Sequence, residues 1–369
     1  MSPNPLVLVD GDTVGRGRTG DESYTVNLLR ELPAAAPELA FAASLRNPSD
    51  LPADVPAAVR RLPLDVASPY RRIPFSFPSL ARRESAALAH LHYFAAPRLP
   101  CPAVVTVHDI SYARAPELFS SRDRMLFRFV RGSLRRAARV IAVSEFTRSD
   151  VVDRYGLEPG KVVAIPNGVS ERFRPLAEAA RTRVHDRFGI NRPYMLCVGA
   201  LQARKNVPLA IEAYARLMGR GTDCELVIAG GDKGGRLDVL DAILRARLTG
   251  RVHLVGHVED DEMPALYSAA KALVFPSLYE GFGLPALEAM ASGTPVIASN
   301  TTGLAEVVGD AGLTVDPRSV EELAEAMGRV LDDSELRERL VGAGLIRAAE
   351  FTWARAAAAT AGVYREVLA

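Results

Sequence analysis

Short apolar runs recur along the chain, and most are followed by a longer segment with apolar residues at helical spacing. Each run has the length and composition of a strand buried in a parallel sheet. The runs that we interpret as strands include 6–9, 41–45, 60–64, 88–93, 103–107, 161–166, 193–198 and 271–276. Because strands alternate with helices twice over, the pattern predicts an α/β fold with two doubly wound parallel sheets facing across a cleft.

Composition narrows the class of protein. The 369 residues suit two domains, with 48% hydrophobic and 24% charged residues. No apolar run approaches the ~20 residues of a membrane helix, and residues 1–5 do not resemble a secretory leader. Cys101, Cys197 and Cys224 are far apart, and the net charge is +1. We therefore expect a soluble cytoplasmic protein with reduced cysteines and no affinity for nucleic acid.

The segment 271–297 predicts a strand, a glycine turn, a helix and a second strand. Pro285 indicates that the helix begins near Leu284, because proline is tolerated in the first helical turn. Amides at the start of such a helix form a site for a phosphate. Glu280 and Glu288, eight residues apart, add carboxylates that accept hydrogen bonds from sugar hydroxyls. The alternative is a surface loop followed by a solvated helix.

Other polar residues follow predicted strands, where open α/β sheets place their ligands. His108 and Asp109 follow the strand 103–107, and His108 is either an active-site residue or a hydrogen-bonded structural one. Arg204 and Lys205 precede a helix and are suited to neutralise a diphosphate; the alternative is a plain surface position. His253 and His257 have the wrong spacing for a helical metal site, so we interpret them as structural.

The stretch KALVFPSLYEGFGLPALEAMASGTPVI resembles the Glu-x7-Glu signature of the retaining glycosyltransferases of family 4, also called group 1. The segments GALQARKN, VIAVSEFTRSD and VVAIPNGVSERFRP are similar to that family as well. The resemblance implies the GT-B fold, with two Rossmann-like domains. It further implies an acceptor-binding domain over residues 1–170, a nucleotide-sugar-binding domain over 171–350, and a C-terminal helix at 351–369 that packs back on the first domain.

The resemblance also implies roles for individual residues. Glu280 and His108 would lie against the donor sugar, Glu288 would hold the ribose hydroxyls, and Arg204 and Lys205 would bind the donor phosphates. Those expected to act in catalysis are His108, Glu280, Arg204 and Lys205. Further residues expected at the donor are Gly17, Gly20, Ser144, Gly199, Gly256, His257, Val258, Gly281, Phe282, Gly283 and Leu284.

The implied reaction is metal-independent transfer of a hexose with retention, without a cofactor. The similarity leans toward mannosyltransferases of bacterial surface polysaccharides, so GDP-mannose is the first donor expected, with UDP-glucose and UDP-N-acetylglucosamine open. The acceptor would be a glycan or a lipid-linked glycan, but Gly20-Asp21-Glu22-Ser23 departs from the usual family pattern and leaves its class open. Asp10 and Asp12 resemble a metal-holding Asp-x-Asp of another glycosyltransferase fold, a role we do not expect here.

Two other functions stay open on sequence grounds. One is a noncatalytic nucleotide-sugar scaffold or sensor, and the other is an epimerase of the same fold. A phosphorylase is not expected, because this sequence has no lysine in a context suitable for pyridoxal phosphate.

Two further segments lead to structural predictions. Residues 68–80, rich in proline and aromatic residues, predict an exposed loop on the acceptor side. Residues 122–139 predict one basic amphipathic helix that is either solvated or attached peripherally to an anionic membrane, with arginines at 124, 128, 131 and 135.

Overall fold

The computed structural model describes residues 4–17, 20–119, 121–178, 184, 186–219 and 221–369, without the side chains of residues 118 and 121–123. Contacts within the chain divide it into two units. Unit 1 comprises Met1–Gly168 together with Phe351–Ala369, and unit 2 comprises Val169–Glu350. Each unit is described by itself. No helix of the described residues is both long enough and apolar enough to cross a membrane.

Unit 1 is built on a seven-stranded sheet in the order β3-β2-β1-β4-β5-β6-β7, in which every neighbouring pair is parallel. Its strands are β1 Leu6–Asp10, β2 Ala40–Leu45, β3 Val59–Pro63, β4 Leu88–His92, β5 Ala103–Val107, β6 Arg139–Ala142 and β7 Val162–Ala164. The inner strands β1, β2, β4, β5 and β6 form from apolar runs, since burial on both faces of a parallel sheet requires apolar residues throughout, whereas the edge strand β3 contains two arginines and is partly exposed.

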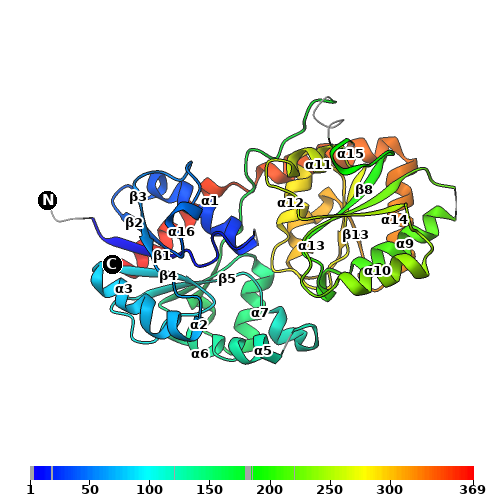
Figure 1. The fold of residues 1–369 in the computed structure, drawn as a ribbon. Coiled ribbons are helices and arrows are strands. Elements are labelled where there is room, and N and C mark those ends of the chain that lie inside the picture. The colour runs from blue at the N-terminus through cyan, green and yellow to red at the C-terminus, as the bar shows by residue number, and fades with distance from the viewer. Residues whose placement is uncertain (1–3, 18–19, 120, 179–183, 185, 220) are drawn as a thin grey trace. The chain divides into compact units, whose positions relative to one another are not determined.

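Helices cover both faces of this sheet. They are α1 Gly20–Ala35, α2 Pro69–Arg71, α3 Phe77–Arg83, α4 Ser111–Arg114, α5 Ser121–Phe127, α6 Val130–Arg136, α7 Glu145–Tyr155 and α16 Trp353–Leu368. Apolar side chains of α3, α6 and α7 form one core with the strands. Helix α1 packs against α16, and α16 also contacts β4 and β6 (Figure 1). A segment from the far end of the chain thus completes unit 1.

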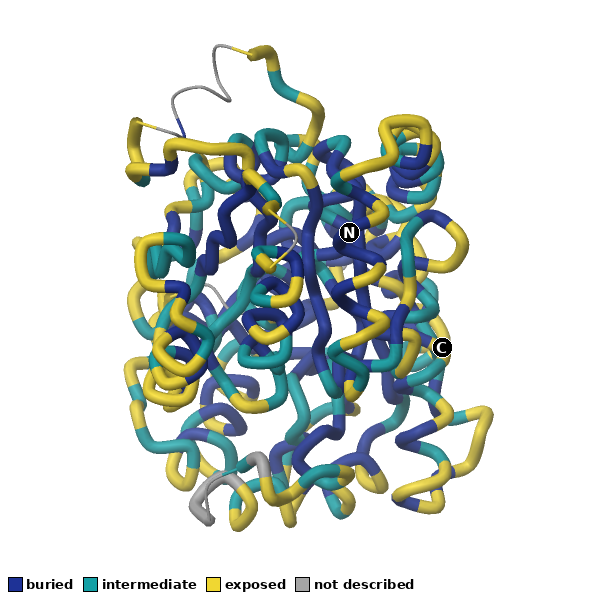
Figure 2. Tube along the Cα trace, turned by 90° about the vertical axis from the view of Figure 1, so that its right-hand side faces the viewer, coloured by how far each residue is buried: buried dark blue, intermediate teal, exposed yellow. Residues whose placement is uncertain are grey.

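Unit 2 repeats the plan with a six-stranded parallel sheet in the order β10-β9-β8-β11-β12-β13. Its strands are β8 Tyr194–Val198, β9 Glu225–Ala229, β10 Val252–Gly256, β11 Ala272–Phe275, β12 Val296–Ser299 and β13 Leu313–Val315. Its helices are α9 Val207–Met218, α10 Arg236–Arg245, α11 Met263–Ala269, α12 Leu284–Ala291, α13 Thr302–Val308, α14 Val320–Asp332 and α15 Ser334–Ala349. Helices α9, α10 and α14 share one core with the sheet. In Figure 2 the buried positions run through the interior, and exposed positions lie on loops and outer helix faces.

The prediction of two doubly wound parallel sheets is confirmed. In each sheet the strand order reverses direction at one place, between β1 and β4 in unit 1 and between β8 and β11 in unit 2. Open α/β sheets bind ligands beside the carboxyl ends of the strands at such switch points. We therefore expect ligand-binding residues on the loops after β8 and β11 in unit 2, and on those after β1, β4 and β5 in unit 1.

The expectation of an exposed loop at residues 68–80 is wrong. The segment is helical throughout, with α2, a π-helical turn at Arg72–Ser76 and α3 in succession. Proline occupies the first turn of α2 and of α3, where it favours a helix start rather than a loop. Phe77 and Leu80 enter the core, and the buried Arg72 donates to both carboxylate oxygens of Asp10. Only part of the segment, such as Phe75, is exposed.

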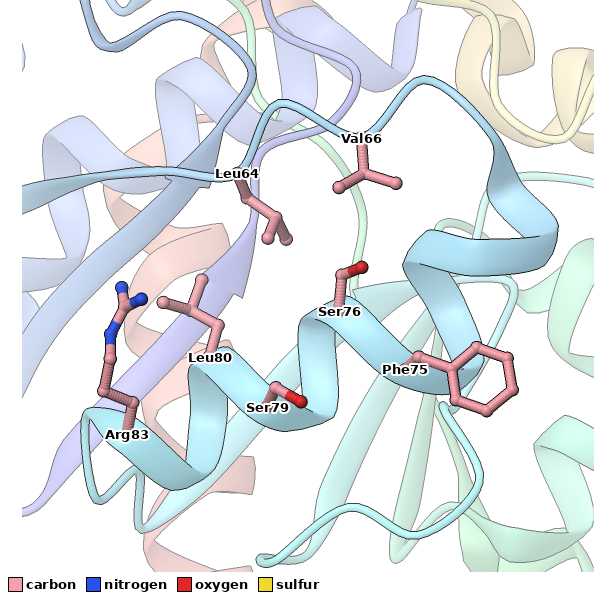
Figure 3. Close-up of a pocket in the computed structure, with 7 residues that line it drawn as sticks. All are labelled: Leu64, Val66, Phe75, Ser76, Ser79, Leu80 and Arg83. Atoms are coloured by element: carbon pink, nitrogen blue, oxygen red, sulfur yellow. The ribbon is translucent and has the colours of Figure 1, made fainter.

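A depression of about 430 Å³ lies beside this segment (Figure 3). Its lining residues are Leu64, Val66, Phe75, Ser76, Ser79, Leu80 and Arg83. Leu64 and Val66 extend from the chain after β3 toward Ser76 and Leu80, so the lining is mostly hydrocarbon with one cation. It contains none of the predicted site residues, and we do not place the candidate site there.

The expectation of one helix over residues 122–139 is also wrong. Two helices, α5 and α6, are separated by a turn at residues 128–129. The Phe129 N–H donates to the Leu126 carbonyl at 3.2 Å, a three-residue turn in place of a helical hydrogen bond. This tighter turn lets Phe127 stack on Tyr112, with ring centroids 3.8 Å apart, while Val130 enters the core. The predicted amphipathic character remains, because the four arginines at 124, 128, 131 and 135 are exposed.

Candidate active site

The residues predicted to bind phosphate lie at the switch point of unit 2. Arg204 and Lys205 form a 3-10 turn after β8, and Glu280 lies on the loop after the neighbouring β11. Asn206 connects the two loops: it adopts a left-handed conformation, and its side-chain amide donates to the Pro276 carbonyl at 3.1 Å. The Leu278 N–H donates to the Arg204 carbonyl at 2.8 Å. One side-chain and one backbone hydrogen bond thus hold the loop of the two cations beside the loop of the carboxylate.

Both cations bind the same carboxylate. Lys205 Nζ donates to Glu280 Oε1 at 2.6 Å, and an Arg204 terminal nitrogen donates to Oε2 at 3.0 Å. The three side chains are 19% (Arg204), 11% (Lys205) and 10% (Glu280) exposed, so screening by water is weak. Burial by itself would raise the pKa of Glu280, but the Lys205 and Arg204 charges outweigh it and lower that pKa to about 2. Two cations and one ionised carboxylate leave a local charge of +1.

The glycine loop after Glu280 is fixed by α13. The Glu280 N–H donates to Thr302 Oγ1 at 3.2 Å, and the Gly303 N–H donates to the Glu280 carbonyl at 3.0 Å. A Cβ on Gly303 would lie 2.1 Å from the Gly281 carbonyl oxygen, so only glycine permits this approach. Helix α12 begins at Leu284 with a proline in its first turn, as predicted. Its positive dipole end therefore faces the loop that follows Glu280.

Glu288 lies in a different environment from Glu280. The Tyr267 hydroxyl, on α11, donates to Glu288 Oε2 at 2.8 Å. Burial is the main cause that raises the pKa of Glu288 to about 7, and the negative charge of Asp260 adds to it. The two carboxylates of the signature therefore differ in protonation: Glu280 is ionised at neutral pH, whereas Glu288 titrates there.

Three further glycines bring backbone segments of unit 2 close together. Gly199 follows β8 with φ +141°, and a Cβ there would lie 3.1 Å from Lys205 Cε. A Cβ on Gly230 would lie 1.9 Å from the Gly199 carbonyl oxygen, and the Gly230 N–H donates to the Gly256 carbonyl at 2.7 Å. The predicted position Gly199 thus follows β8 and Gly256 ends β10, the two strands that flank β9. His257 is exposed, and Val258 is buried.

The predicted residues of unit 1 centre on His108 after β5. Its Nε2 lies 3.0 Å from Nδ1 of His92, at the end of β4, and the two rings are nearly parallel, with an interplanar angle of 19° and centroids 5.2 Å apart. Tyr24 of α1 meets the His108 ring edge-on, with a centroid separation of 4.9 Å. Burial lowers the pKa of both His92 and His108 to about 4. His108 is therefore neutral at pH 7 and lies at the switch-point edge of its sheet.

The other predicted residues of unit 1 lie in different local environments. Gly17 is exposed with φ +84°, and Gly20 begins α1; the two residues between them lie outside the described part of the chain. Ser144 is fully buried, and its Oγ accepts a hydrogen bond from the Thr147 N–H at 3.0 Å, which caps α7. Contact of any of these three with a donor stays a prediction.

Several residues of these sites were not predicted. They are His92, Asn206, Tyr267 and Gly303. A signal existed for His92, because alternate residues of a strand share one face and His90-x-His92 ends β4, next to the strand β5 that His108 follows. The others depend on contacts between elements far apart in sequence, which periodicity does not reveal.

The carboxylates Asp10 and Asp12 are paired with arginines. Asp10 binds Arg72, and Asp12 lies 2.9 Å from nitrogens of both Arg16 and Arg46. His253 Nε2 lies 3.1 Å from a Glu225 oxygen. Within the described ranges, no group of three or more His, Cys, Asp or Glu side chains is placed to hold a metal ion.

Comparison with known proteins identifies the family. The profile described as "Glycosyl transferases group 1" matches residues 181–345, and "Glycosyltransferase Family 4" matches residues 18–173. O-antigen chain mannosyltransferase B of Escherichia coli is 34% identical over 267 residues, or 71% of this chain and 70% of that protein. Alpha-D-kanosaminyltransferase of Streptomyces kanamyceticus is 33% identical over 306 residues, or 78% of this chain and 79% of that protein.

A solved structure shares the fold. Crystalline HepE of Anabaena in complex with UDP-glucose superposes with a TM-score of 0.79 at 17% identity, covering 98% of this chain and 99% of that one. Two Rossmann-like sheets, the matched profiles and these relatives agree. The chain belongs to the group 1 glycosyltransferases of the GT-B fold and is a glycosyltransferase.

Proposed function

We propose that the protein is a retaining, metal-independent hexosyltransferase that takes its sugar from a nucleotide diphosphate. The observation that carries the proposal is the placement of Arg204 and Lys205 on one buried carboxylate at the switch point of unit 2. The first donor to test is GDP-mannose, and the acceptor would be a glycan or a lipid-linked glycan of a cell-surface polysaccharide.

The charge of the cluster suits a diphosphate. Glu280 orients two cations without cancelling them, so a net positive charge remains beside the positive end of α12. Preorganised charge of this kind stabilises negative charge that develops on a leaving group. Arg204 and Lys205 would therefore take over the charge compensation that a divalent metal supplies in other transferases.

Retention follows from a front-face substitution. The bond between the anomeric carbon and the diphosphate oxygen breaks, and the acceptor oxygen forms its bond on the same face of the sugar. The departing diphosphate takes the acceptor's proton, so atoms and charges balance. Glu280 would bind sugar hydroxyls rather than attack the anomeric carbon, because both its oxygens already accept hydrogen bonds from cations.

The choice of donor is supported by the names of the relatives and by the residues beside the glycine loop. Glu288 and Tyr267 form a carboxyl–hydroxyl pair that suits the two ribose hydroxyls of a nucleotide. One relative is named as a mannosyltransferase and another as a kanosaminyltransferase, and HepE has been solved with UDP-glucose. GDP-mannose is therefore preferred, and UDP-sugars are the second choice. His108 would contact the donor sugar.

Attachment to the cytoplasmic face of a membrane completes the proposal. Met125 and Phe129 are 58% and 61% exposed, and they accompany exposed arginines on α5 and α6. Apolar side chains together with cations bind anionic lipid surfaces. Cosedimentation with anionic vesicles should fall in a Met125→Ser/Phe129→Ser variant. Equal binding by the variant and the wild type would contradict this role.

The decisive experiment is calorimetric titration with GDP-mannose, UDP-glucose and the free nucleotides, each with and without Mg²⁺. Binding of one nucleotide family without Mg²⁺ supports the proposed donor site and identifies the base. Release of the nucleoside diphosphate in the presence of an acceptor distinguishes an active transferase from a noncatalytic scaffold. Binding that requires Mg²⁺ would contradict metal independence, and an inverted product would contradict the front-face course.

A further inference from the structure

His92 lies between His108 and the first turns of α1. Its Nδ1 is 3.0 Å from His108 Nε2, and its Nε2 is 3.0 Å from the Thr25 hydroxyl oxygen. The Thr25 hydroxyl in turn lies 2.8 Å from the Asp21 carbonyl oxygen and 3.2 Å from the Thr13 hydroxyl. These contacts form one chain of hydrogen bonds that begins at helix backbone and ends at the candidate active-site histidine.

The direction of each hydrogen bond follows from the chemistry of the groups. A carbonyl oxygen only accepts, and two oxygens 2.8 Å apart repel unless a proton lies between them. Thr25 must therefore give its single proton to the Asp21 carbonyl. The proton between Thr25 and His92 then belongs to His92 Nε2, and the proton between the two hydroxyls belongs to Thr13.

Because His92 is neutral, its protonation determines which nitrogen of His108 holds a proton. Burial is the main cause that lowers the pKa of His92 to about 4, although Asp21 and Asp10 act in the opposite direction. A neutral imidazole has one N–H, and in His92 that N–H is on Nε2. Its Nδ1 therefore accepts, and the proton shared with His108 belongs to His108 Nε2.

We propose that His92 is a positioning residue that holds His108 in the Nε2–H tautomer, so that His108 presents an unprotonated Nδ1 as a hydrogen-bond acceptor. The orientation is reinforced by the near-parallel alignment of the two rings, at an interplanar angle of 19°, which suits an in-plane hydrogen bond, and by the contact with the Tyr24 ring. Asp21 Oδ1, 3.8 Å from His108 Nε2, is too distant to replace His92 as the acceptor.

This orientation determines what His108 recognises, an inference that rests on the proposed function. A lone pair at Nδ1 accepts a hydrogen bond from a sugar hydroxyl and repels a phosphate oxygen, which has no proton to donate. His108 would thus select the sugar end of the donor, whereas Arg204 and Lys205 select the phosphates. Removal of the His92 acceptor would leave the His108 Nε2–H without a partner and favour the opposite tautomer.

The direct test is nitrogen NMR of the full-length protein labelled with ¹⁵N-histidine at pH 7.5. Long-range proton–nitrogen correlations distinguish a protonated ring nitrogen from an unprotonated one. The chain has six histidines, and His92→Asn and His108→Asn assign the two signals concerned. We expect both rings protonated at Nε2 and unprotonated at Nδ1. A His108 ring protonated at Nδ1 would overturn the proposal.

Kinetics then connect the tautomer to turnover. His92→Leu removes the acceptor and should lower kcat about tenfold to a hundredfold, with a smaller change in the donor KM. His92→Asn keeps an oxygen at the position of Nδ1 and should recover most of the loss. The matched control is His90→Asn on the same strand, because His90 bonds Thr106 and Tyr364 instead of His108 and should leave the His108 signal unchanged.

The outcomes separate this inference from the proposed function. An unchanged His108 tautomer and an unchanged kcat in His92→Leu would overturn the role of His92 while the transferase activity stands. Wild-type turnover in His108→Ala would overturn the role of His108 in the proposed function, even if the NMR of the wild type agrees with the expected tautomers.

Discussion

Glu280 and Glu288 show how one loop and helix hold two carboxyl groups in opposite states. Both are buried, and burial by itself raises the pKa of each. Glu280 has two cations as partners, which reverse the effect, whereas Glu288 has a tyrosine hydroxyl and a nearby carboxylate. At the scale of residues, the partner rather than the burial decides the charge.

The raised pKa of Glu288 gives a pH dependence of stability. Between its unfolded pKa of about 4.5 and its folded pKa of about 7, the folded protein binds more protons than the unfolded chain. The Glu288 contribution to stability should therefore fall as pH rises through this window, by about 3 kcal/mol in total at 1.36 kcal/mol per unit, whereas the buried His92 and His108, whose pKa values are lowered, act in the opposite direction. Glu288→Gln should remove the Glu288 contribution, so the difference between the two profiles, measured by calorimetric unfolding from pH 5 to 8, isolates it. Parallel profiles for the two proteins would contradict the assignment.

Removal of either cation should affect turnover more than folding. Arg204→Ala or Lys205→Ala is expected to lower kcat by about 10²–10³, because charge on the leaving diphosphate loses a partner. Arg216→Ala on α9 is the control, since that arginine is 51% exposed and pairs only with Glu321 in the described contacts. Steady-state kinetics and thermal midpoints measure the two effects. Near wild-type turnover in the Arg204→Ala/Lys205→Ala double variant would contradict the assignment.

Sequence reasoning located the candidate residues better than it described their contacts. His108, Arg204, Lys205 and Glu280 follow apolar runs, and the carboxyl ends of parallel strands lie at one edge of a sheet. Which carboxylate meets which cation depends on loop geometry, so the pairing of Glu280 with both cations was not predictable. The tautomers of His92 and His108 depend on Thr25, which belongs to a different element.

At the scale of elements, the strands were the most predictable parts and the irregular helical segments the least. Prolines in residues 68–80 are typical of a loop, but in the structure two of them occupy first turns of helices. Residues 122–139 have helical periodicity throughout, and the turn at 128–129 arises from tertiary packing of Phe127 and Val130. Local patterns do not contain that information.

The contact between α13 and the glycine loop provides a prediction at this scale. Gly303→Ala would place a Cβ against the Gly281 carbonyl, so the loop or α13 must shift, at a cost of about 1–3 kcal/mol. Donor affinity should fall with stability, because the same loop carries Glu280. Gly342→Ala, in open space on α15, should instead raise stability by up to about 1 kcal/mol. Calorimetric unfolding and donor titration measure both. Unchanged donor affinity in Gly303→Ala would contradict the coupling.

At the scale of the whole molecule, unit 1 is discontinuous in sequence. Helix α16 packs on α1, and its Tyr364 lies 2.5 Å from His90 Nδ1 in the core. Trp353 and Tyr364 are buried, and Arg365 Nε donates to Glu38 at 2.7 Å. Unit 2, by contrast, is one continuous stretch of chain. The two units thus differ in what they need to fold.

A chain truncated after Glu350 should therefore lose the structure of unit 1 but keep that of unit 2. Without α16, α1 loses the helix that packs on it, and the buried His90 loses its Tyr364 partner and keeps only Thr106. Hydrogen exchange read peptide by peptide should show lost protection in β1 to β7 and native protection in β8 to β13. Gly362→Ala, which keeps α16 and meets open space, is the control. Native protection in unit 1 of the truncated chain would contradict the prediction.

The discontinuity of unit 1 has a consequence for biosynthesis. A ribosome adds about 5–20 residues per second, and domains generally fold as they emerge. The sheet of unit 1 emerges before unit 2, but the helix that covers one of its faces emerges only after unit 2 is complete. During that interval α1 and β4 lack the helix that packs on them, and apolar surface left uncovered in this way is prone to aggregate. The hydrogen bonds that lead from Thr25 of α1 through His92 to His108 thus depend on a helix that gains its packing partner last.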